Sequence, residues 1–107
     1  MNLWEETLDT LNENGSSWED VNFISCDGFR IEKNNFKDVA TNTDYNNGYG
    51  KQEIASDLKL YGNDFVMIRL EYEGSEWWEF ISTKPDTSLE TKTIARLIYD
   101  HYHNSLE

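Results

Sequence analysis

The sequence feature that most constrains the fold is the stretch of residues 65–81, FVMIRLEYEGSEWWEFI, the densest apolar and aromatic run in the chain. Residues 65–68 are apolar, residues 69–73 alternate between polar and apolar, and Gly74 interrupts the stretch near the middle. Alternation with a period of two is typical of a strand that buries one face, and a glycine between two such runs indicates a turn. We therefore predict a β-hairpin.

The register of this hairpin decides which side chains share a face, because a shift of one residue moves every side chain to the other side. A loop of residues 74–75 pairs Leu70 with Glu79 and mixes charged and apolar groups on both faces. A loop of residues 74–76 pairs Leu70 with Phe80 and separates them, so we predict this register, with a bulge or a longer loop as the alternative. The predicted buried face holds Val66, Ile68, Leu70, Tyr72, Trp78 and Phe80, and the opposite face holds Glu71, Glu73, Trp77 and Glu79.

A second hairpin is predicted by Asp27-Gly28, because this pair supplies the positive φ angles that a type I′ turn needs at both central positions. It joins an apolar run at residues 21–26 to another at residues 29–31. A further strand is expected at residues 58–61, directly before the first hairpin.

Helices are predicted on both sides of these strands. Residues 2–13 place apolar side chains three and four positions apart, as an amphipathic helix does. A capping box at residues 87–90 opens a helix to about residue 104, with one apolar stripe on the sheet. A short helical turn is expected at residues 35–40.

These elements predict an α+β domain. Its antiparallel sheet has about five strands in two hairpin units, packed against the N- and C-terminal helices. The length of 107 residues suits a single domain, which we assign to residues 1–105. Residues 106–107 match a cloning scar and are left out of the fold prediction.

The chain is strongly acidic, with 21 Asp and Glu against 9 Lys and Arg and a formal net charge of −12. Binding to nucleic acid or to an anionic membrane needs clustered Lys and Arg, so we expect neither as a direct partner. A protein partner with a basic surface remains open. The single Cys26, the absence of a signal-peptide pattern and the lack of a long apolar run favour a cytoplasmic location.

The sequence contains no catalytic, cofactor or metal signature, and we expect no enzyme activity, cofactor or bound metal. The carboxylates of residues 71–79 are compatible with paired acid–base chemistry, but a solvated strand face explains them better. His101 and His103, two apart on a predicted helix, point in different directions and cannot share one metal.

Residues 41–53, rich in Asn, Asp, Thr and Gly, predict a long loop that carries Tyr45 and Tyr49. Two interpretations are open for these tyrosines. They contact a partner, or they fix a solvated loop to the sheet.

Three segments, SSWEDVNFIS, GYGKQEIASDL and YGNDFVMIRLEYEGSEWWEF, carry a further likeness. Across roughly residues 17–80 the chain resembles a set of small uncharacterised proteins encoded in phages and prophages of Gram-positive bacteria. The resemblance implies a mobile-element origin and no catalytic residues.

The sequence favours a small acidic protein-interaction module that binds through an exposed aromatic and acidic hairpin face. Adjacent strand residues point to opposite faces, so Trp77 and Trp78 cannot both enter one core, and aromatic side chains are common at binding hot spots. The candidate partner-binding residues are Glu71, Glu73, Trp77, Glu79, Tyr45 and Tyr49. The alternatives are a DNA mimic that inhibits a nucleic-acid-processing enzyme and, less favoured, an uncharacterised enzyme.

Overall fold

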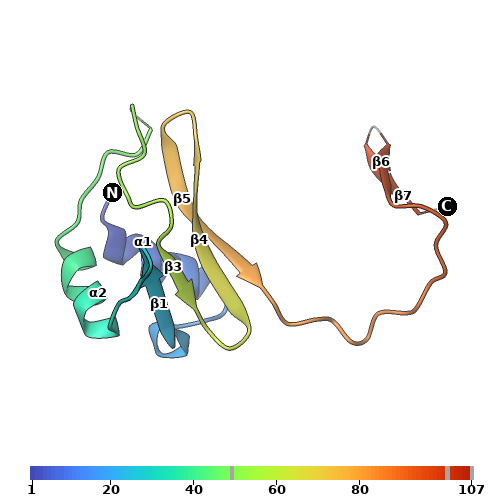
Figure 1. Cartoon of the computed structure of the whole chain (residues 1–107), viewed down its shortest axis with the longest axis horizontal. Coiled ribbons are helices and arrows are strands. Elements are labelled where there is room, and N and C mark those ends of the chain that lie inside the picture. Colours follow the sequence, from blue (N-terminus) through green and yellow to red (C-terminus); the bar gives the residue numbers. More distant parts are fainter. Residues whose placement is uncertain (49, 101, 107) are drawn as a thin grey trace.

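The computed structural model describes residues 1–48, 50–100 and 102–106, with two helices and a five-stranded sheet in the main body (Figure 1). In chain order the elements are α1 (Leu3–Glu13), the 3₁₀-helix η1 (Trp18–Asp20), β1 (Phe23–Cys26), β2 (Phe29–Arg30), α2 (Lys33–Thr41), β3 (Lys59–Tyr61), β4 (Phe65–Tyr72), β5 (Ser75–Ser82), β6 (Ile98–Asp100) and β7 (His103–Ser105). The sheet order is β2-β1-β3-β4-β5, and every neighbouring pair is antiparallel. The predicted α+β class is confirmed.

The sheet buries one face and leaves the other uncovered. Ile24, Leu60, Met67 and Trp78, from four neighbouring strands, lie in one hydrophobic core cluster. The same cluster contains Leu3 and Leu11 of α1 and Phe36 and Ala40 of α2. Both helices therefore cover the same side of the sheet, which we call the inner face, and the opposite side is the outer face.

Helix α1 begins where the sequence predicts it. The side-chain oxygen of Asn2 accepts the backbone N–H of Glu5 at 3.1 Å, which satisfies one of the free donors at the helix start. Leu3, Thr7 and Leu11 recur at four-residue spacing and are buried, so they form the stripe that faces the sheet.

The hairpin at Asp27-Gly28 is confirmed. Asp27 and Gly28 have φ angles of 53° and 77°, and Cys26 pairs with Phe29 across the turn. A type I′ turn requires positive φ at both central residues, and this dipeptide accepts that conformation at low cost.

The register predicted for the hairpin at residues 65–81 is wrong, because its turn begins one residue earlier than predicted. Glu73 and Gly74, with φ angles of 50° and 87°, form a two-residue turn, and Leu70 pairs with Trp77 rather than with Phe80. The inner face of this hairpin holds Phe65, Met67, Arg69, Glu76, Trp78 and Phe80. Charged Arg69 and Glu76 point inward because they pair there, whereas the predicted register assumed that charges face solvent.

The predicted C-terminal helix at residues 88–104 is also wrong. Strands β6 and β7 form a separate two-stranded sheet beyond a linker that leads away from the body (Figure 1). At the predicted helix start, Asp86 accepts the backbone N–H of Ser88 at 3.0 Å and closes a turn instead. The β-branched residues Thr91, Thr93 and Ile94 disfavour helix, and residues of α1 and α2 supply the helical part of the core.

Within the described ranges, no helix is both long enough and apolar enough to cross a lipid bilayer.

Candidate functional site

The outer face is an apolar and aromatic surface. Successive residues of a strand point to opposite faces, so the residues next to each inner-face residue along its strand point outward. One row across four strands consists of Phe23, Tyr61, Val66 and Ile81, each paired with the next. A second row consists of Arg30, Ser25, Lys59, Ile68 and Glu79. Leu70 with Trp77, and Tyr72 with Ser75, continue the face toward the hairpin turn.

Aromatic contacts order the β1–β3 side of this face. The guanidinium carbon of Arg30 lies 4.9 Å from the centre of the Phe23 ring. The Phe23 ring meets the Tyr61 ring edge-on, with centroids 5.8 Å apart and planes at 75°. A cation over a ring and an edge-on ring pair are both attractive arrangements, so these side chains are held in place without a covering helix.

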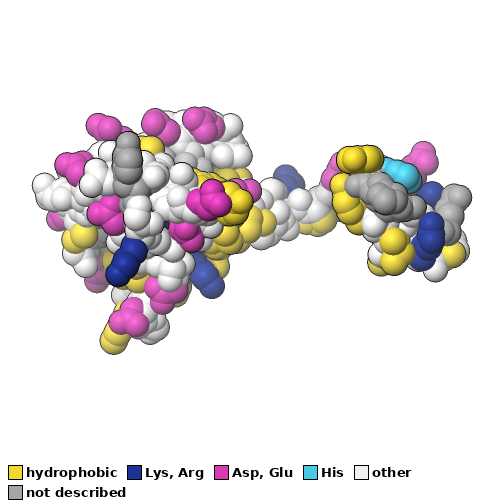
Figure 2. Space-filling view, turned by 90° about the horizontal axis from the view of Figure 1, so that it is seen from above, with side chains coloured by type: hydrophobic (Ala, Val, Ile, Leu, Met, Phe, Trp, Pro, Cys, Tyr) yellow, Lys and Arg dark blue, Asp and Glu magenta, His cyan; other side chains and the backbone are white. Residues whose placement is uncertain are grey.

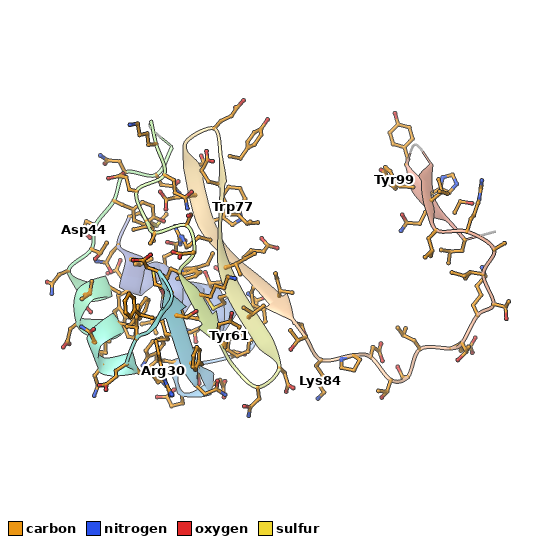
Figure 3. All side chains as sticks on the ribbon, viewed as in Figure 1. Arg30, Asp44, Tyr61, Trp77, Lys84 and Tyr99 are labelled. Carbon is orange, nitrogen blue, oxygen red and sulfur yellow. The ribbon has the colours of Figure 1, made fainter. Side chains whose placement is uncertain are left out.

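Trp77 lies on the β4–β5 side of the face, while Tyr61 lies on the neighbouring part of the sheet (Figure 3). The indole N–H of Trp77 donates to a Glu79 carboxylate oxygen at 3.3 Å. Leu70 and Ile81 on the same face are 37% and 40% exposed. Apolar side chains gather on the body close to the point where the C-terminal linker leaves it (Figure 2). Burial of this surface against another molecule would release water from apolar area, which is favourable.

The structure separates the four hairpin residues predicted to share a face. Trp77 and Glu79 lie on the outer face. Glu71 follows Arg69 in the inner-face row but is exposed, and its carboxylate accepts the backbone N–H of Gly74 at 3.0 Å. Glu73 belongs to the turn. The exposed surface around Trp77 is therefore aliphatic and aromatic more than acidic.

Tyr45 is not on the surface. It is 5% exposed, and its hydroxyl donates to a carboxylate oxygen of Glu6 at 2.5 Å. Burial, and then the hydrogen bond to Glu6, raise the pKa of Tyr45 to about 12. Tyr45 thus fixes its loop to the core, which is the second of the two interpretations, and Tyr49 lies outside the described residues.

A buried cluster of charged side chains lies beneath the hairpin. We call Arg69, Glu6, Glu76 and Tyr45 the Arg69 cluster. One guanidinium nitrogen of Arg69 lies 3.1 and 3.0 Å from the two Glu6 oxygens, and the other lies 2.9 Å from Glu76. The Arg69 and Glu76 side chains are both 0% exposed. Sequence reasoning missed this cluster, although a turn at Glu73 and Gly74 would have placed Arg69 and Glu76 diagonally on one face.

The Arg69 cluster joins three parts of the chain. The Glu76 carboxylate accepts the backbone N–H groups of Glu53 and Ile54, at 2.7 and 3.2 Å, and so holds the end of the long loop. The Glu6 carboxylate accepts the backbone N–H of Trp78 at 3.1 Å. Each carboxylate is hydrogen-bonded, as burial of charge requires. The arrangement is that of a structural ion-pair network.

The exposed edge of β5 is partly closed by the same residues. The backbone N–H of Glu76 donates to the Asn47 side chain at 2.8 Å, and that of Trp78 donates to Glu6. An open strand edge invites pairing with another strand, and side chains that occupy its donors prevent this. These contacts hinder strand addition at the turn end of β5, whereas neither helix covers the outer face of the hairpin.

Other features of the body carry weaker chemical signals. No group of three or more metal-ligating side chains occurs among the residues that the structure describes. The Cys26 thiol donates to Asp57 at 3.4 Å. Burial and the neighbouring Asp57 raise the pKa of Cys26, which lowers the fraction of reactive thiolate. The outer face remains the best candidate for a functional surface.

Comparison of the chain with protein-family models, curated proteins and solved structures found no match. The likeness to phage-encoded proteins therefore stays an expectation from three sequence segments. The functional argument depends on the geometry of the outer face.

Proposed function

We propose that this chain is a small protein-interaction module that binds its partner through the outer face. The observation that carries the proposal is the asymmetry of the sheet: both helices pack on the inner face, and an aromatic and aliphatic outer face is left uncovered. Contiguous exposed apolar patches on small proteins are often binding surfaces.

The composition of the face supports a protein as the partner. Trp77, Tyr61 and Arg30 are residue types enriched at binding hot spots, because they offer large contact area or multiple hydrogen bonds. The face is built from side chains of adjacent strands, which suits a broad protein surface. Its strand positions include one carboxylate, Glu79, so nucleic-acid mimicry would have to use a different surface.

In this proposal, the acidic side chains of the body surround the contact surface. Asp and Glu side chains are scattered over the visible face of the body in Figure 2, and they are not aligned in rows. A partner with basic groups around an apolar centre would be steered toward such a surface. We include the expected cytoplasmic location in the same proposal, since Cys26 is a free thiol.

Capture from a lysate tests this function. The immobilised protein is compared with a Leu70→Lys variant, and the matched control is Val39→Lys. Val39 is an apolar residue on α2, on the other side of the molecule, and is 60% exposed. A hot-spot contact is worth about 2 kcal/mol or more, so Leu70→Lys should weaken capture roughly 30-fold.

The salt dependence adds a second readout. Capture that depends on apolar contact should persist at high salt, whereas a charge-driven complex should weaken. Equal capture by the wild type and by Leu70→Lys would remove the outer face as the binding surface.

A further inference from the structure

We infer that the molecule that occupies the outer face is a second copy of this chain, packed face to face about a two-fold axis. The inference rests on the proposed function, because it names the partner of the same surface. Two sheets with apolar faces pack about 10 Å apart with their strands roughly aligned. A two-fold axis makes such an interface self-complementary. If a residue of one copy contacts a given residue of the other, the same two positions also meet with the copies exchanged.

The second row of the outer face has the charge pattern that this symmetry requires. Arg30 lies at one edge of the sheet on β2, and Glu79 lies in the same row at the other edge on β5. An axis parallel to the strands and close to the central β3 places β2 of one copy over β5 of the other. Arg30 of each copy then faces Glu79 of the other, which gives two ion pairs across one interface.

The apolar row fits the same arrangement. Under this axis, Phe23 on β1 lies over Val66 on β4 of the other copy, and Tyr61 on the central strand lies near its own symmetry mate. Phe23 is 39% exposed in the single chain and would be covered. The contact therefore joins aromatic with aliphatic side chains, as in the interior of a β-sandwich.

Lys59 gives the arrangement a distinctive weakness. It lies in the middle of the charged row, on β3, so the axis brings the two Lys59 side chains toward each other. Like charges that approach in an interface are unfavourable. Replacement of Lys59 by leucine should therefore tighten a two-fold pair, whereas the same loss of a cation would weaken binding to an acidic partner.

The charge at this surface also permits self-association of an acidic chain. The charged residues at the strand positions of the outer face are Arg30, Lys59 and Glu79, which give this surface a net charge of +1. The whole chain has a net charge of −12. The acidic groups thus lie outside the contact, where added salt screens their repulsion.

Sedimentation velocity of the full chain over a hundred-fold range of concentration tests the inference, at low and high salt. We expect a monomer–dimer equilibrium that Glu79→Arg weakens at least tenfold, since Arg30 would then face an arginine. The double variant Arg30→Glu with Glu79→Arg restores opposite charges and should recover most of the affinity. Lys59→Leu should strengthen the dimer, and Val39→Lys should leave it unchanged.

Three outcomes would overturn the inference. The first is a monomer at every concentration, the second is a dimer that ignores Glu79→Arg, and the third is a double variant no better than the single one. Coverage of the outer face by the C-terminal segment of the same chain would give a monomer and would count against the second copy. Loss of dimerisation with lysate capture that still depends on Leu70 would leave the proposed function standing, whereas failure of both assays would remove both.

Discussion

A guanidinium nitrogen of Arg69 lies 2.9 Å from a carboxylate oxygen of Glu76, and both side chains are fully buried. Glu6, with a side chain 10% exposed, binds the other side of the same guanidinium. Two carboxylates and one guanidinium would be a costly set to bury alone. Backbone N–H groups of the loop and the hairpin donate to the two carboxylates and make the burial tolerable, although the buried Nε of Arg69 has no hydrogen-bond partner among the described residues.

Removal of the cation from this cluster should destabilise the protein strongly. Arg69→Met leaves Glu6 and Glu76 without their counter-ion in a dry site, and such a loss costs about 3–5 kcal/mol. Urea denaturation measures the change in unfolding free energy. The control Lys84→Met removes a positive charge from an exposed position on the linker and should change stability by less than about 0.5 kcal/mol. A loss below about 1 kcal/mol for Arg69→Met would contradict the buried network.

The two adjacent tryptophans should differ in their effect on stability. Trp78 is 4% exposed, and its indole N–H donates to the Thr7 hydroxyl at 2.9 Å. Trp78→Ala should therefore cost about 3–5 kcal/mol, and Trp77→Ala, on the outer face, clearly less. The measurement is urea denaturation at low protein concentration, where association does not contribute. An equal loss for the two variants would make Trp77 a core residue and count against the outer face as a contact surface.

Stability should fall at high pH because of Tyr45. Burial and the hydrogen bond to Glu6 raise the pKa of Tyr45 to about 12, so the folded state keeps the phenol proton more tightly than the unfolded chain does. The contribution is complete below the ordinary tyrosine pKa of about 10 and is lost as pH rises toward 12. The stability difference between wild type and Tyr45→Phe, measured by urea denaturation at increasing pH, should shrink across this window. A constant difference would show that Tyr45 titrates normally.

The hairpin turn offers a stabilising substitution. Glu73 has a φ of 50°, a conformation that Asn accepts more readily than Glu, and Gly74 follows it at 87°. Glu73→Asn should raise the unfolding free energy by about 0.5–1 kcal/mol. Glu73→Gln is the control, since it removes the same charge and keeps the unfavourable backbone. If both variants gain equally, relief of charge and not turn geometry is the cause.

Elements whose local sequence signals agree with their packing in the fold could be predicted from the sequence. Asp27-Gly28 predicted its turn because the dipeptide and the flanking apolar runs give the same answer. The helix at residues 2–13 was predictable because Leu3 and Leu11 of its apolar set enter the core, although Thr7 fills the buried position between them. The α+β class follows from these elements.

The hairpin register was not predictable from the alternation of polar and apolar residues. Arg69 and Glu76 are inward charges stabilised by Glu6 and by the loop at Glu53, partners that lie far away in the sequence. For the same reason the candidate site was only half predicted. Trp77 and Glu79 were placed together on one face, but their aliphatic neighbours Ile68 and Leu70 were assigned to the core.

The C-terminal helix failed for a different reason. Its capping box and apolar spacing are helical signals, but a helix of this length depends on burial of its stripe. The core is already closed by α1 and α2 on the inner face. Without that burial, the local turn at Asp86 and the β-branched residues decide the structure of the segment.

The occupied edge of β5 limits how this chain can assemble. The backbone donors of Glu76 and Trp78 are held by Asn47 and Glu6, so a strand added at the turn end of β5 would first have to displace these side chains. Two-fold assembly through the outer face uses the same surface on both copies and leaves none of that surface free. In the two-fold arrangement inferred above, growth through the outer face would stop at a pair, and solutions of the protein should stay clear as its concentration rises.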